Sequence, residues 1–101
     1  MAKIIVLFNL KPGVSIADYE RFARETDLPI VNKLPSVRSF EVLKAQGTLG
    51  GGASPYQYLE IIDLVSLEQL GQDVSTETMQ KVAATFQSMA DNPQFIITES
   101  L

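Results

Sequence analysis

Two segments of this chain place apolar side chains on both faces of an extended backbone. Residues 4–10 and 56–65 are short, rich in β-branched and aromatic residues, and flanked by proline-containing turns, which predicts two strands. Because successive side chains of a strand point to opposite faces, such strands need a covering layer on each side. One face carries Ile4, Val6, Phe8, Tyr56, Tyr58, Ile62 and Leu64, and the other carries Ile5, Leu7, Leu59 and Ile61.

Helical periodicity follows the first of these strands. Apolar residues recur at spacings of three and four over residues 16–26, and Ser15 precedes them as a capping residue, so a helix is expected there. Pro29 lacks an N–H and clashes with the preceding turn. A kink or restart is therefore predicted near Asp27, after which the helix should continue to Leu34.

The rest of the chain supplies two further strands and two further helices. A strand of mixed polarity is expected over residues 37–46, at an edge of the sheet, and another over residues 95–98. A capping box predicts a short helix over residues 66–71, and an apolar stripe over residues 79–90 predicts a longer one. The glycine-rich segment 47–55 is expected to be a mobile loop.

The order strand–helix–strand–strand–helix–strand predicts one domain over residues 1–101. Its expected fold is α+β, a ferredoxin-like βαββαβ two-layer sandwich. Two helices cover only one face of a four-stranded sheet, so the second apolar face of the two central strands is left uncovered in a single chain. An identical copy is the simplest cover, and we therefore expect a homodimer.

Charge and missing residue types exclude several kinds of function. Eight basic and twelve acidic residues give a net charge of −4, which disfavours binding to nucleic acid or to an anionic membrane. The chain has no cysteine and no histidine, so it lacks thiolates, the commonest metal ligand and the usual base near neutral pH. We expect no metal and no cofactor. A cytoplasmic protein is expected, since no segment resembles a signal peptide or a membrane span.

Three stretches of the sequence resemble a known superfamily. Ile4–Gly13, Thr26–Pro29 and Asn32–Arg38 resemble the corresponding stretches of dimeric α+β barrel proteins. Over its whole length the chain most resembles the RedY-like proteins of prodiginine (prodigiosin) biosynthesis. This resemblance implies a dimeric α+β barrel whose pocket binds a small apolar aromatic metabolite of the pyrrole type.

The chain departs from these relatives at positions that carry chemistry. Many relatives have histidine where this chain has Ile4, and histidine or tyrosine where it has Asp27; cyclase relatives have a further histidine near Thr78. A mechanism with a histidine base therefore cannot be carried over. The polar residues that remain near the family's cavity are Asp27, Tyr19, Tyr58 and Glu60.

Each of these four residues has a functional and a structural interpretation. Asp27 is either a catalytic acid–base group, assisted by Tyr19, or the N-cap of the restarted helix. Glu60 either orients a ligand or is neutralised by a salt bridge, for example with Arg38 or across a dimer. Tyr19 and Tyr58 are either proton donors or core residues with one hydrogen bond. The candidate substrate-binding residues are Glu60, Tyr58, Phe22, Phe40 and Met89, with Phe8 as a further apolar wall.

Three functions remain open at this point. The first is a biosynthetic pathway protein that binds an apolar aromatic intermediate as a carrier or condensation aid. The second is a cofactor-free enzyme, of the cyclase or monooxygenase type, in which Asp27 and a tyrosine perform acid–base chemistry. The third is a structural dimer without a ligand.

Overall fold

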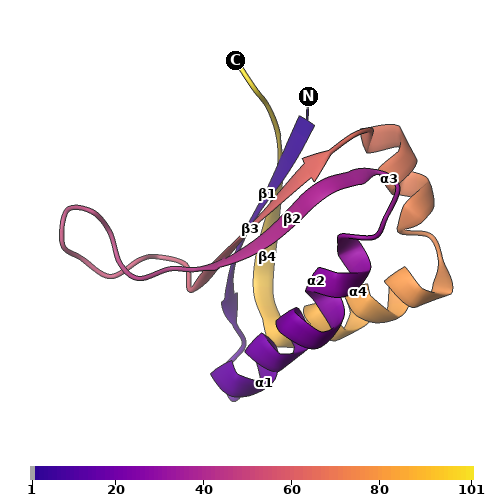
Figure 1. Ribbon diagram of the computed structural model, residues 1–101. Coiled ribbons are helices and arrows are strands. Elements are labelled where there is room, and N and C mark those ends of the chain that lie inside the picture. Colours follow the sequence, from indigo (N-terminus) through magenta and orange to yellow (C-terminus); the bar gives the residue numbers. More distant parts are fainter. Residues whose placement is uncertain (1) are drawn as a thin grey trace.

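The computed structural model, which describes residues 2–101, has one layer of helices on one four-stranded antiparallel sheet (Figure 1). The strand order is β2-β3-β1-β4, so β1 and β3 are central and β2 is an edge strand. The predicted ferredoxin-like α+β fold is confirmed. In chain order the elements are β1 (Ala2–Leu10), α1 (Ile16–Phe22), the π-helical segment η1 (Ala23–Asp27), α2 (Leu28–Val31), β2 (Val37–Lys44), β3 (Tyr58–Leu64), α3 (Leu67–Asp73), α4 (Glu77–Met89) and β4 (Ala90–Glu99).

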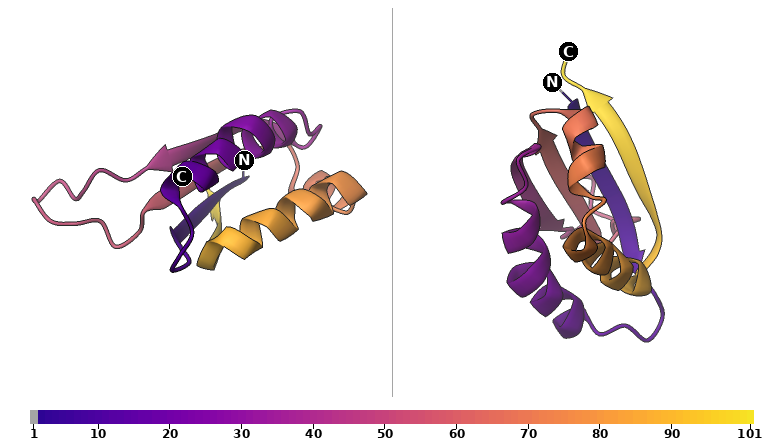
Figure 2. Two further views of the ribbon diagram at one scale, coloured as in Figure 1. Left: turned by 90° about the horizontal axis from the view of Figure 1, so that it is seen from below. Right: turned by 90° about the vertical axis from the view of Figure 1, so that its right-hand side faces the viewer.

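The helices cover one face of the sheet, as both views of Figure 2 show. On β1 the side chains facing the helices are buried, whereas those facing the other way are only half-buried. Residues that lie opposite each other in an antiparallel pair share a face. Val6 pairs with Glu60, and Phe8 with Tyr58, on the helix side; Leu7 pairs with Leu59 on the open side. The open face of the sheet is therefore apolar and uncovered within one chain.

Aromatic rings fill one half of the core. Phe8 stacks on Tyr58 with ring centroids 5.6 Å apart, and it meets Phe86 of α4 edge-on at 4.9 Å. Tyr19 of α1 contacts Phe8 at 5.5 Å and Tyr58 at 4.7 Å. These contacts fix both helices against the central strands.

Several elements end at other residues than the sequence predicts. The helix after β1 ends at Val31 rather than Leu34, because the Asn32 side chain donates to the Leu28 and Phe40 carbonyls and accepts from the Phe40 N–H. Helix α3 continues past Gly71 to Asp73.

The fourth strand is longer than predicted. It begins at Ala90, directly after α4, and contains Asn92-Pro93, a pair that in a sequence usually signals the end of a helix. Asn92 has a positive φ of 46°, and the pairing with β1 shifts register between Leu7 and Asn9. An edge strand with a bulge accommodates proline, which explains why this signal interrupts neither element.

A second bulge lies in β2. Strict alternation along this strand would place Val37 on the face opposite Phe40, but both residues are buried. The pairing of β2 with β3 shifts register between Val37 and Ser39, so the intervening Arg38 side chain reaches Asp63, with Nη1 3.9 Å from Oδ1.

The connection between β2 and β3 extends away from the body of the molecule (Figure 1). Its tip is held by hydrogen bonds from the Thr48 N–H to the Gly52 carbonyl and from the Gly52 N–H to Thr48 Oγ1, both 2.9 Å long. Both flanking strands are shorter on this side than predicted, since β2 ends at Lys44 and β3 begins at Tyr58. Over residues 2–101, the helices are too short or too polar to cross a membrane.

Candidate functional site

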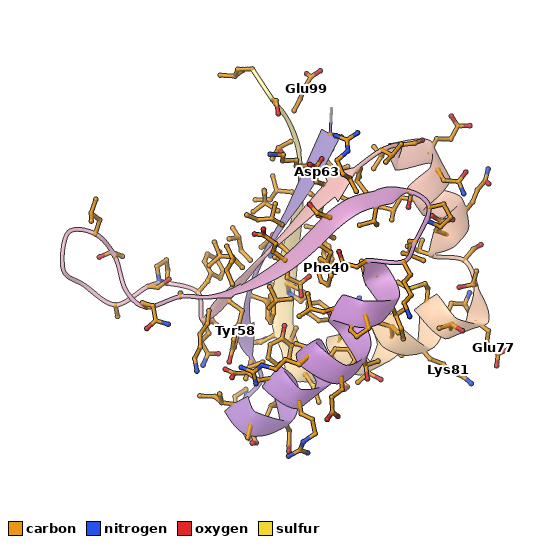
Figure 3. The ribbon with its side chains drawn as sticks, in the orientation of Figure 1. Phe40, Tyr58, Asp63, Glu77, Lys81 and Glu99 are labelled. Carbon is orange, nitrogen blue, oxygen red and sulfur yellow. The ribbon has the colours of Figure 1, made fainter. Side chains whose placement is uncertain are left out.

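A cavity of about 250 Å³ lies between the sheet and the helices. Its walls come from all four strands, from η1 and α2, and from α3 and α4 with the segment between them. Figure 3 shows Phe40, one wall residue, directed from β2 toward the helices. Two carboxyl groups interrupt an otherwise almost wholly apolar lining. The lining residues are Ile4, Asp27, Val31, Leu34, Phe40, Glu60, Ile62, Leu70, Val74, Met79, Val82, Ala83, Phe86, Gln87 and Phe95.

The π-helical segment places Asp27 in this cavity. The Leu28 N–H donates to the Ala23 carbonyl, five residues back, so this turn holds one residue more than an α-helical turn. Pro29 has no N–H to donate to the Glu25 carbonyl and would clash with it in a regular helix, and the wider turn removes that conflict. Where a kink or a restart was predicted, the backbone stays helical and contains a π-helical turn instead of a break. Asp27 makes no capping hydrogen bond, so the N-cap interpretation is wrong.

Glu60 reaches the same cavity from the centre of the sheet. It lies on β3 opposite Val6 and Val42, and it is 4% exposed. Its Oε2 atom has no hydrogen-bond partner of good geometry within residues 2–101. Arg38, a candidate cation for a salt bridge, lies beside Asp63 on the open side of the sheet instead. Within the described chain Glu60 is therefore a buried carboxyl without a salt bridge.

Burial raises the pKa of both carboxyls. The pKa of Asp27 rises to about 6 because its charged form is desolvated. The pKa of Glu60 rises to about 8, first by desolvation and then by the negative charge of Asp27, against a lowering by the nearby Tyr19 hydroxyl. The two groups titrate as a pair, so near neutral pH the pair holds a single negative charge.

Tyr19 lies behind the pair. Its side chain is fully buried, and its hydroxyl has no partner of good hydrogen-bond geometry among residues 2–101. Burial raises the pKa of Tyr19 far above its usual value, and the charges of Glu60 and Asp27 raise it further. Asp27, Glu60 and Tyr19 therefore form one electrostatically coupled group with spare hydrogen-bonding capacity.

The other candidate residues divide between the cavity and the core. Phe40 lines the cavity, whereas Phe8, Phe22, Tyr58 and Met89 do not. Phe8, Phe22 and Tyr58 are buried in the core, and Met89 is half-buried against it. The Tyr58 hydroxyl donates to Glu20 Oε2 over 2.7 Å. The structure thus brings Asp27, Glu60 and Phe40 together around the cavity, with Tyr19 next to the two carboxyls, and it places the remaining candidates elsewhere in the fold.

The sequence did not indicate most of the residues that line the cavity. Met79 and Phe86 belong to the amphipathic stripe of α4, which predicts core packing, and they are indeed buried. They also face the cavity. Phe95 of β4 lines it too and is 53% exposed. An apolar stripe together with one carboxyl on each layer, Asp27 among the helices and Glu60 on the sheet, is a signal that could have indicated a cavity.

The arrangement favours two kinds of chemistry. Apolar walls with a few polar groups are typical of small-molecule sites, and a buried carboxyl pair can accept hydrogen bonds or exchange a proton near neutral pH. Within residues 2–101 no cluster of three or more potential metal ligands is present.

Comparisons with known proteins identify one matching family and several structures of similar fold. The family model described as "REDY-like protein HapK" matches residues 2–101. The crystal structure of HapK from Hahella chejuensis is 26% identical, with a TM-score of 0.82, covering 100% of this chain and 93% of that one. No curated protein sequence matches significantly.

Two more distant structures share the fold. A protein from Bacteroides fragilis, described as dimeric and ferredoxin-like, is 14% identical with a TM-score of 0.69, covering 98% of this chain and 95% of that chain. SnoaB from Streptomyces nogalater, described as a cofactor-independent oxygenase, is 9% identical with a TM-score of 0.78, covering 98% and 91%. At these identities the likeness concerns the fold alone.

Proposed function

Since this chain belongs to the REDY-like HapK family, we propose that it is a small biosynthetic protein that binds an apolar aromatic intermediate between its sheet and its helices. The intermediate is of the pyrrole type, as in prodiginine pigment formation. The Asp27–Glu60 pair recognises its ring N–H groups or a protonated ring nitrogen. The protein then holds and orients this molecule during a condensation step of the pathway.

The Glu60 Oε2 atom, which is buried without a hydrogen-bond partner among residues 2–101, is the observation that carries this proposal. A buried carboxyl without a partner is unfavourable by several kcal/mol, so a stable protein keeps one where a ligand completes it. Apart from Asp27 and the exposed Gln87, the walls around it offer only apolar contacts. A flat aromatic ring with N–H donors on one edge satisfies both parts of the site, because the ring contacts the walls while the N–H groups donate to the carboxyls.

Binding of a matched pair of ligands tests this proposal. 2,2′-Bipyrrole carries two N–H donors, and 2,2′-bithiophene has nearly the same shape without them. We expect the protein to bind bipyrrole more tightly, by about 10- to 100-fold, since a hydrogen bond to a charged group contributes about 1.5–3 kcal/mol. Glu60→Gln should remove most of this preference, measured by calorimetric titration. Equal affinity of the wild-type protein for both ligands would contradict the proposal.

Glu25→Gln is the matched control for this experiment. Glu25 lies in the same π-helical segment as Asp27, but it is exposed and does not line the cavity. Its substitution should leave both affinities unchanged. A loss of bipyrrole affinity in this variant would indicate a general electrostatic effect rather than recognition inside the cavity.

A cofactor-free enzyme is the second candidate function. Burial brings the pKa of Asp27 to about 6, which suits proton exchange with a bound substrate near neutral pH. Asp27→Asn keeps the shape and removes the titration, so in extracts of the pathway turnover should fall about 100-fold or more while the fold survives. An Asn variant with full activity leaves binding alone as the function.

The open face of the sheet supports a homodimer. Ile5, Leu7, Leu59, Ile61 and Ile96 share this face, and burying several such side chains contributes about 1.5–3 kcal/mol each. Sedimentation should therefore give about twice the chain mass of 11.1 kDa.

Leu7→Asp should dissociate the dimer into folded monomers. Ile62→Asp, on the helix side, should destabilise the fold itself. A wild-type monomer at micromolar concentration would refute the dimer.

A further inference from the structure

The wall of the 250 Å³ cavity contains acidic groups but no basic group. Asp27 comes from the helical layer and Glu60 from the sheet, while Gln87, at the surface, adds a neutral amide. The other lining residues are apolar, and among residues 2–101 no lysine or arginine lines this cavity. The negative charge of the pair is therefore not neutralised by the part of the chain that the structure describes.

The basic side chains lie at other places in the fold. Arg24 and Lys44 line a smaller cavity beside α1 and β2, where both pair with Glu20: Arg24 Nη2 is 3.3 Å from Oε1, and Lys44 Nζ is 2.9 Å from Oε2. Arg38 lies beside Asp63 on the open side of the sheet. The half-buried Glu20 thus has two cations within the described chain, whereas the more deeply buried Glu60 has none.

The pair keeps a charge at neutral and alkaline pH. The ionisable groups beside Glu60 are Asp27 on η1 and Tyr19 on α1. No such group comes to the cavity wall from α2, α3, α4, β1, β2 or β4. Tyr19 stays neutral, because burial raises the pKa of its hydroxyl. Burial raises the pKa of Asp27 only to about 6, so at pH 8 the pair holds at least one negative charge. A charge in an apolar site is stable when an opposite charge accompanies it.

The rest of the wall suits a flat aromatic cation. Phe40 on β2, Phe86 on α4 and Phe95 on β4 all line the cavity, and the rings of such residues attract cations through their negative faces. A dry cavity of about 150 Å³ holds one benzene ring, so 250 Å³ is enough for two fused rings. Size, ring contacts and charge therefore favour the same class of molecule.

We propose that this cavity selects a flat, two-ring heterocycle in its cationic form, with the positive charge beside Asp27 and Glu60 and the rings against the apolar wall. This inference rests on the proposed function, since it names the charge of the molecule that the same cavity binds. For a ligand that is a weak base, selection of the cation means that binding raises the pKa of the ligand. The protein then takes the protonated form from a solution in which most of the ligand is neutral.

Two probes of equal outline test the charge preference. 1-Methylquinolinium is a permanent cation, 1-methylnaphthalene is its neutral counterpart, and neither has an N–H group. At pH 8 we expect the wild-type protein to bind the cation about tenfold or more tightly, measured by fluorescence titration within the solubility of each probe. The preference should shrink as pH falls to 5, because the pair takes up protons while surface carboxylates stay largely ionised.

A double variant locates this preference in the cavity. Asp27→Asn combined with Glu60→Gln removes both charges and keeps the shape, so the preference for the cation should disappear. Its affinity for 1-methylnaphthalene should persist, which shows that the cavity is still formed. Glu25→Gln combined with Glu77→Gln is the matched control, since it changes the net charge equally at two exposed positions outside the cavity. This control should keep the wild-type preference.

Three results would overturn the inference. They are equal affinity of the wild-type protein for both probes at pH 8, no binding of 1-methylquinolinium at millimolar concentration, and a preference for the cation that survives in the double variant of Asp27 and Glu60. None of them decides the bipyrrole test, because these probes carry no N–H donor. Conversely, equal binding of bipyrrole and bithiophene together with a retained preference for the cation would contradict N–H recognition alone.

Discussion

Glu60 and Asp73 are both buried carboxyls, exposed by only 4% and 9%, yet their surroundings give them opposite properties. Asp73, at the end of α3, accepts hydrogen bonds from the Ser36 N–H and from Gln69 Nε2, both 2.9 Å long. These bonds lower its pKa. Glu60 has an Oε2 atom without a partner of good geometry within residues 2–101, and its pKa rises to about 8.

The difference shows that burial alone does not identify a functional carboxyl. Asp73 joins the turn before β2 to α3, and its hydrogen bonds are completed within the chain, so it stabilises the fold. Glu60 has the same chemistry but lies beside a cavity with apolar walls, so its hydrogen bonds remain to be completed from outside. Hydrogen-bond satisfaction distinguishes the two roles, and it predicts opposite effects of pH and of mutation.

The pH dependence of stability gives the largest expected difference. The Glu60 pKa is raised from 4.5 to about 8 on folding, so between these values the folded protein binds more protons than the unfolded chain. Stability should therefore fall as pH rises from about 5 to 9, by about 3–5 kcal/mol from this group. Urea unfolding at a series of pH values and at a fixed protein concentration measures this change in the free energy of unfolding.

Glu60→Gln should flatten the pH dependence. The variant should resemble the wild-type protein at pH 5 and be the more stable of the two at pH 9, because it has no charge to bury. Glu25→Gln, at an exposed position, should follow the wild-type curve. A wild-type protein as stable at pH 9 as at pH 5 would show that Glu60 is paired after all, across a dimer for example.

Replacement of Asp73 should lower the stability of the protein, whereas replacement of Glu60 should raise it at alkaline pH. Asp73→Ala leaves the buried Ser36 N–H without an acceptor, so the melting temperature should fall by about 5–15 °C at neutral pH. Asp73→Asn keeps one acceptor oxygen and should cost about half as much. The contribution of Asp73 is lost as pH falls through its lowered pKa, on the acid side, whereas that of Glu60 changes on the alkaline side. Equal stability of Asp73→Ala and wild type would remove the contrast.

Replacement of an exposed carboxyl should have the smallest effect on stability. It provides a baseline for the Glu60 and Asp73 variants. Glu77 lies on the outside of α4 with its Oε1 3.3 Å from Lys81 Nζ, and the side chains are 84% and 76% exposed (Figure 3). Such pairs contribute little, because water solvates both charges. Glu77→Gln should change the free energy of unfolding by less than about 0.5 kcal/mol at any pH from 5 to 9. A larger change would mean that the urea measurement reports more than local contacts.

The layers and strand order follow from patterns that the sequence displays directly. Apolar residues on both faces of β1 and β3 predict central strands, and helical spacing predicts the layer that covers one of these faces. Element ends were harder to predict, because they depend on contacts between distant residues. Asn32 ends a helix through its bonds to Phe40, and Pro93 lies within a strand because the bulge in β4 opposite β1 accommodates it.

The site was predictable in its chemistry and not in its geometry. Asp27 and Glu60 are conspicuous as acidic residues beside apolar neighbours, and the structure brings them into one cavity. Tyr58 was expected in the same place, because it shares a face of β3 with Glu60. Its ring is instead buried against Phe8 and Tyr19, and its hydroxyl reaches Glu20 Oε2. Such reach depends on the separation of α1 and β3, which no local pattern encodes.

The π-helical segment that carries Asp27 has a consequence for how this site changes over generations. Loss of a single codon between residues 23 and 26 would restore ordinary helical spacing and rotate Asp27 by about 100°, to the position that Thr26 now holds. The fold would persist and the acid would leave its cavity in one mutational event. Among descendants of a common ancestor, the number of residues between Tyr19 and Pro29 therefore separates lineages that keep this chemistry from lineages that keep only the scaffold.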